Sequence, residues 1–107
     1  MTEAASDAVI HPYNRLRICA MLSSVESLGF SEVRDAPGVS DSVLSKQLKA
    51  LQKAGYLTLR KETLGSRVRT WLALTHAGRE ALAAHLRELR RIAESADFLG
   101  RQGRREP

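Results

Sequence analysis

The chain has 107 residues, a formal net charge of +5, 43% hydrophobic residues and 27% charged residues. This length suits a single domain with one core and leaves no room for a second, separate domain. No apolar run approaches the roughly 20 residues that a bilayer span needs, and the first residues, MTEAASD, carry acids where a secretory signal would carry basic residues. We therefore expect a cytoplasmic protein with no membrane partner.

The first third of the chain predicts an arm and two helices. Residues 1–8 are small and polar, and we expect a flexible arm there. An apolar helix is predicted to begin near Pro12, and the lone Cys19 within it is expected to be a buried small hydrophobe. Ser31 is expected to cap a short helix over residues 32–36, which Pro37 and Gly38 end.

The next segment predicts a longer helix with one buried stripe. Ser40 is a natural N-cap and Gly55 a natural stop, so the helix should cover residues 41–54. Leu44, Leu48 and Leu51 repeat at helical spacing and form the buried stripe, while small, polar and basic side chains lie largely on other faces. A short helix, a turn and a helix with a basic outer face form the helix-turn-helix arrangement.

After Gly55 the period of the pattern changes to two. This predicts strands over residues 56–61 and 68–74, joined by turn residues 63–66 with Gly65 at the tip. Thr75 should cap a last helix from His76 to about Leu99, and residues 100–107 should be a disordered basic tail. The expected domain, residues 9–99, is mainly α with a small β-hairpin, a winged helix-turn-helix of order α-α-α-β-wing-β-α.

The positive charge is concentrated in one third of the chain. Seven basic residues stand against the single acid Glu62 between Ser42 and Thr75, a balance of +6, and the remainder therefore sums to −1. A basic block inside a patterned, foldable segment indicates a surface that binds a polyanion.

Three runs of sequence carry a family resemblance: HPYNRLRICAML, GFSEVRDAPGVSDSVLSKQLKALQKAGYL and GSRVRTWLALTHAGREAL. Together they resemble the MarR-like winged-helix regulators, specifically the compact bacterial subgroup of about this length, over residues 10–92. The resemblance implies a sequence-specific DNA-binding transcriptional regulator whose dimers form through terminal helices and place two recognition helices on a pseudo-palindromic site. Pro37 stands where members usually carry an aliphatic residue, which is expected to shorten or tilt the end of the short helix.

The residue chemistry supports the same roles. Short side chains near the start of a recognition helix allow close approach to base edges, and long cations further along suit phosphates, although any single lysine could equally solvate a helix face. Arginines at the wing could reach the DNA backbone or the minor groove. We expect DNA contacts from Ser42, Val43, Ser45, Lys46, Gln47, Lys49 and Lys53 of the helix and from Ser66, Arg67 and Arg69 of the wing.

The last helix carries an apolar stripe that is wider than a small domain uses. A partner helix explains this width, whereas the alternative is that the stripe folds back wholly on its own domain. The expected homodimer interface consists of Leu82, His85, Leu86, Leu89, Ile92, Ala93 and Ala96.

These features lead to a homodimeric regulator of a pseudo-palindromic operator in double-stranded DNA. We expect a repressor, since a bare DNA-binding dimer can block a promoter without an activation surface. The alternative is a winged-helix module that binds protein and not DNA. No cofactor or metal is predicted, because His11, His76 and His85 have no Cys and no second His at i+3 or i+4. The sequence contains neither a nucleophile placed near a general base nor a Gly-rich phosphate loop, so we do not expect an enzyme. Whether a small-molecule inducer binds stays open.

Overall fold

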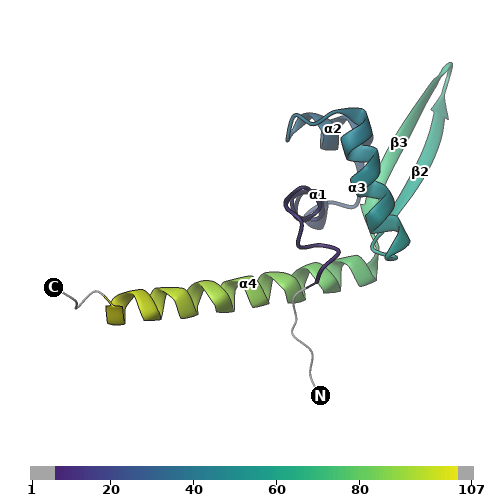
Figure 1. The fold of residues 1–107 in the computed structure, drawn as a ribbon. Coiled ribbons are helices and arrows are strands. Elements are labelled where there is room, and N and C mark those ends of the chain that lie inside the picture. The colour runs from purple at the N-terminus through teal and green to yellow at the C-terminus, as the bar shows by residue number, and fades with distance from the viewer. Residues whose placement is uncertain (1–6, 104–107) are drawn as a thin grey trace.

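The computed structural model describes residues 7–103 and contains four helices and a small sheet (Figure 1). The three strands are antiparallel, in the order β1-β3-β2. In chain order the elements are α1 (Tyr13–Ser23), β1 (Leu28–Gly29), α2 (Phe30–Asp35), α3 (Asp41–Lys53), β2 (Leu57–Leu64), β3 (Arg67–Leu74) and α4 (His76–Gly103).

Helix α1 buries one face and exposes the other. Pro12 precedes its first residue, and Ile18, Cys19 and Leu22 are buried in the core. Burial raises the pKa of the Cys19 thiol to about 11, so this side chain is a neutral, buried hydrophobe, as the sequence predicted.

Strand β1 was not predicted, and α2 begins two residues earlier than expected. Leu28 and Gly29 pair with Leu72 and Trp71 of β3. The prediction of Ser31 as the cap of α2 is wrong, because Gly29 is the N-cap and its amide donates to the Glu32 carboxylate at 2.7 Å. A two-residue strand is too short to show a period, and its partner lies far along the chain.

Helix α3 forms almost as predicted. The amide of Val43 donates to the Ser40 hydroxyl at 3.2 Å, which satisfies one of the free amides at the start of the helix. Leu44, Leu48 and Leu51 are buried together, and Gly55 takes a φ of 82° just beyond the helix.

The hairpin of β2 and β3, the wing, is longer than expected. The strands run to Leu64 and start again at Arg67, so that only Gly65 and Ser66 form the turn. Gly65 has a φ of 65°, a conformation that a tight hairpin requires and that favours glycine.

Helix α4 starts as predicted and ends later. Thr75 caps it by accepting from the Gly78 amide at 3.0 Å. The helix continues to Gly103, so residues 100–103, which we expected in a disordered tail, are helical. Residues 104–107 and residues 1–6 of the expected arm lie outside the described part, whereas residues 7–8 of that arm have defined positions.

The core sits where α1, α3 and the base of the wing meet the first turns of α4. In α4, every residue from 90 to 103 is exposed, and this half of the helix projects away from the other elements (Figure 1). Among residues 7–103, none of the helices has the uninterrupted apolar length that a bilayer span requires. The buried hydrophobic residues are Ile10, Ile18, Cys19, Leu22, Val33, Leu44, Leu48, Leu51, Leu57, Leu72, Leu74 and Leu82.

Candidate nucleic-acid interface

Helix α3 presents a short polar and cationic face to solvent. Ser42, Ser45, Lys46, Lys49 and Lys53 are exposed, as is Val43 at 38%, whereas Gln47 is half-buried. None of the three lysines is in an ion pair within residues 7–103. The face therefore combines side chains short enough for close approach with cations that are free to meet phosphate.

Helix α2 fixes the start of α3 through one arginine. The Arg34 guanidinium donates to Asp35 at 2.8 Å and to Asp41, in the first turn of α3, at 2.9 Å. Hydrogen bonds to Asp35 and then Asp41 raise the pKa of Arg34 above its ordinary value. The link spans the turn that contains Pro37, and neither helix's own pattern indicated it.

The three predicted wing residues do not have the same surroundings. Ser66 and Arg67 are exposed at the tip, and Arg67 is in no ion pair within the described residues. Arg69 instead reaches Glu32 of α2 at 3.4 Å and stacks over the Trp71 ring, 4.4 Å from its centroid. Arg69 thus joins the wing to α2 in addition to carrying charge.

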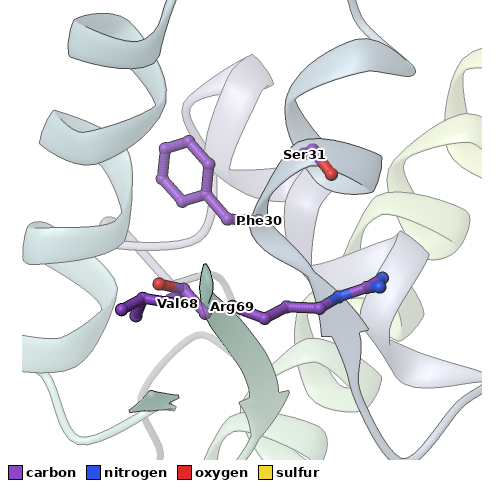
Figure 2. A pocket seen from close by; sticks show the side chains of 5 residues that line it. Phe30, Ser31, Val68 and Arg69 are labelled. Atoms are coloured by element: carbon purple, nitrogen blue, oxygen red, sulfur yellow. The ribbon is translucent and has the colours of Figure 1, made fainter. Parts of the chain in front are cut away.

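A hollow separates the start of α2 from β3, and Figure 2 shows its walls. It has a volume of about 220 Å³ and is lined by Phe30, Ser31, Val68, Arg69 and Thr70. Val68 and Arg69 point in opposite directions from the strand (Figure 2). An adjoining hollow of about 280 Å³ reaches Leu64 and Arg67 at the tip of the wing.

The predicted interface residues on α4 divide into two groups. Leu82 and His85 are buried in the domain itself, and Leu86 and Leu89 are half-buried, with Leu86 packed against the core. The structure thus places the first part of the stripe inside the domain. Only the remaining three, Ile92, Ala93 and Ala96, are exposed, Ile92 at 49%.

His85 uses both ring nitrogens within the domain, an arrangement that the sequence did not indicate. Its Nδ1 accepts from the Asp7 amide at 3.0 Å, and its Nε2 lies 3.1 Å from Nδ1 of His11. Since Nδ1 is an acceptor, the ring hydrogen is on Nε2 and points at His11. Within residues 7–103, no group of three or more His, Cys, Asp and Glu side chains could hold a metal ion.

The sequence matches a family model described as "Winged helix DNA-binding domain" over residues 14–93. The match covers α1 to the middle of α4, so it includes the whole helix-turn-helix and the wing. The chain belongs to this winged-helix family.

Relatives of this winged-helix chain come from archaea and bacteria. An uncharacterized protein of Methanocaldococcus jannaschii is 25% identical over 83 residues, 78% of this chain and 90% of that protein. The structure of a transcriptional regulator homologue from Pyrococcus horikoshii is similar with a TM-score of 0.78 and 21% identity, covering 83% of this chain and 88% of that one. The structure of the zinc-responsive MarR family member ZitR of Lactococcus lactis is similar with a TM-score of 0.63 and 20% identity, covering 95% of this chain and 69% of that one.

These similarities confirm two predictions from the sequence. The fold is a winged helix-turn-helix, and the MarR-like resemblance holds at the level of fold. The family described by the matching model binds DNA, which agrees with the basic face of α3 and with the wing beside it. Which residues of this winged-helix chain contact DNA stays a prediction.

Proposed function

We propose that the chain is a homodimeric transcriptional regulator that binds a pseudo-palindromic site in double-stranded DNA. The observation that carries the proposal is the row of exposed cations on α3, without ion pairs to any described residue, next to a basic wing in a winged helix DNA-binding domain. Such cations neutralise phosphates and release the counterions condensed on DNA.

Residues of α3 would make two kinds of contact with DNA, to base edges and to phosphates. Ser42, Ser45 and Lys46 lie in its first half, the end of a recognition helix that meets base edges in the major groove. Lys49 and Lys53 lie further along and suit phosphates, with Arg67 and Ser66 of the wing reaching the backbone or minor groove. We expect Val43 and Gln47 at the edges of this surface and Arg69 at its border with α2.

The projecting half of α4 supports dimer formation. In the described part of the chain, residues 90–103 of α4 are all exposed and carry Ile92, Phe98 and Leu99 beside Ala93 and Ala96. Pairing with the same half of a second copy would bury these side chains and place two recognition helices about one helical turn of DNA apart, roughly 34 Å. Sedimentation at micromolar concentration should give a dimer, and a monomer would contradict this part of the proposal.

We infer repression as the mode of regulation, because a bare DNA-binding dimer can occlude a promoter. The second candidate function is a module that binds protein through the wing. It is favoured by two apolar side chains near the wing tip, Leu64 and Val68, which are 56% and 63% exposed. A protein-binding wing would need neither the free lysines of α3 nor salt-sensitive binding to duplex DNA.

Fluorescence anisotropy with a labelled duplex tests the proposal across a salt series. Changing Lys49→Ala should weaken binding and reduce the slope of log K against log salt by about 1.8, because each of the two subunits loses one phosphate contact worth about 0.9. The matched control is Arg87→Ala, which removes one exposed cation from α4 and should leave the slope unchanged. Equal slopes in all three proteins would refute the phosphate role of Lys49.

A further inference from the structure

Residues 7–12, which we call the N-terminal strap, connect two elements that lie far apart in sequence. The Asp7 amide donates to Nδ1 of His85 in α4, at 3.0 Å and across 78 positions. The Asp7 carboxylate accepts from the Tyr56 hydroxyl at 2.6 Å. One residue therefore holds both α4 and the segment that directly follows α3.

The strap is built to hold this position. The second Asp7 carboxylate oxygen accepts from the amides of Val9 at 2.8 Å and Ile10 at 3.1 Å, and the His11 amide donates to the Asp7 carbonyl at 2.8 Å. The Ile10 side chain is fully buried in the core. These bonds fold the strap into a closed turn that orients Asp7 toward its two partners.

Both partners are themselves firmly placed. His85 is 0% exposed and also meets His11 of the strap through Nε2. Tyr56 is tied to α3 because its amide donates to the Leu51 carbonyl at 3.0 Å. Through Asp7, the end of the recognition helix and the middle of α4 become parts of one hydrogen-bonded unit.

His85 is also the last fully buried residue of α4. Beyond it the helix gradually leaves the domain, and it extends 18 residues further to Gly103, about 27 Å at a rise of about 1.5 Å per residue. A tilt of about 10° at His85 would move the far end by about 5 Å, more than the 3.4 Å between successive base pairs. A contact at His85 thus has a large effect on where a partner subunit would sit.

We propose that Asp7 is a positioning residue: by bridging Tyr56 and His85 it sets the angle between α3 and the projecting half of α4, and thereby the half-site spacing that the dimer accepts. The second clause rests on the proposed dimeric DNA binding, whereas the first concerns the isolated chain. Asp7, Tyr56 and His85 act through other elements and are not among the residues proposed to contact DNA.

Two variants and one control test the angle. Tyr56→Phe removes only the hydroxyl that donates to Asp7, and Asp7→Ala removes the carboxylate. Tyr13→Phe is the matched control, because the exposed Tyr13 hydroxyl accepts from Arg17 at 3.5 Å and has no other hydrogen bond within residues 7–103. Residual dipolar couplings of backbone amides report the orientation of α4 beyond His85 relative to α3. We expect a changed or broadened orientation in the first two proteins and no change in the control.

The second readout is the affinity for duplexes whose two half-sites are at the preferred spacing or one base pair closer or further apart. Tyr56→Phe and Asp7→Ala should lose discrimination between spacings while keeping the affinity for a single half-site. Unchanged dipolar couplings would overturn the positioning role, as would unchanged discrimination or an equal loss on the single half-site. Failure of the unmodified protein to bind any duplex would instead refute the proposed function, and the couplings would still decide whether the strap sets the angle.

Discussion

At the scale of single residues, the tightest constraint lies where α4 passes Tyr56, just beyond the end of α3. A Cβ atom on Gly78 would clash with the backbone carbonyl of Tyr56, which cannot move because its oxygen accepts from the Thr75 amide at 3.0 Å. Glycine is thus required here for close approach of two backbones, even though it is a poor residue for the interior of a helix.

We therefore expect Gly78→Ala to destabilise the fold by about 1 to 3 kcal/mol, the usual cost of forcing extra volume into a packed site. Gly100→Ala in the same helix has open space around it and should be neutral or stabilising by up to about 1 kcal/mol. Urea denaturation of the two variants checks the difference, and equal stability would show that the backbones are not in contact.

Asp7 makes stability depend on pH. Burial would raise the pKa of its carboxyl, but hydrogen bonds from Tyr56, Ile10 and Val9, together with the nearby His85, lower it below the ordinary value of 3.8. A lowered pKa in the folded state means that the stabilisation is complete above the pKa of the unfolded chain and is lost as pH falls through the folded value.

The unfolding free energy of Asp7→Asn should therefore be lower than that of the unmodified protein at pH 6, and the two should converge as the pH falls below 4. Thermal or urea unfolding at several pH values measures this. A difference that stays constant down to pH 2 would mean that the ionised carboxyl contributes nothing to the fold.

At the scale of elements, local sequence determines much of the fold. The cap at Ser40, the leucine stripe of α3, the change of period after Gly55 and the cap at Thr75 each act within a few residues, and the structure contains all four. Strand β1 and the bond between Arg69 and Glu32 depend on partners 37 or more positions apart. Neither periodicity nor capping residues indicate pairs so far apart in sequence, so only the structure shows them.

The candidate site follows the same division. The exposure of Ser45, Lys46 and Lys49 could be predicted from the helical period alone. The contacts of Arg69 with Glu32 and Trp71 could not be predicted, because the alternation along the strand indicates only that Arg69 is exposed. Likewise, the stripe on α4 predicted an apolar face, but only the packing of Leu82 and His85 showed how much of that face the domain itself uses.

The wing arginines should behave differently when removed. Arg67→Ala should reduce the salt slope of duplex binding by about 1.8, about 0.9 from each subunit, without changing stability, because the exposed Arg67 side chain has no ion-pair partner within residues 7–103. Arg69→Ala should weaken binding and also cost stability, up to about 1 kcal/mol, since it loses exposed contacts to Glu32 and Trp71.

Glu32→Gln separates these two effects of Arg69. The amide oxygen can still accept from Gly29, while the ion pair to Arg69 is removed. This variant should reproduce part of the stability loss of Arg69→Ala and leave the salt slope unchanged. If Arg69→Ala instead matches Arg67→Ala in both measurements, Arg69 contacts DNA only and has no part in holding the wing to α2.

At the scale of the whole molecule, the chain is not compact. It measures 68 × 35 × 22 Å and has a radius of gyration of 17.4 Å. A globular domain of this length would have a radius of about 13 Å. The projecting half of α4 accounts for the difference in form (Figure 1), and its exposed Ile92, Phe98 and Leu99 are the side chains that the proposed dimer would cover.

Selection of bound sequences from a pool of random duplexes examines DNA binding, sequence specificity and site symmetry in one experiment. We expect enrichment of an inverted repeat whose half-sites are centred about 10 base pairs apart, with each mismatch costing about 1 to 3 kcal/mol. A pool that stays random after repeated rounds, or that converges on a single site without two-fold symmetry, would contradict it.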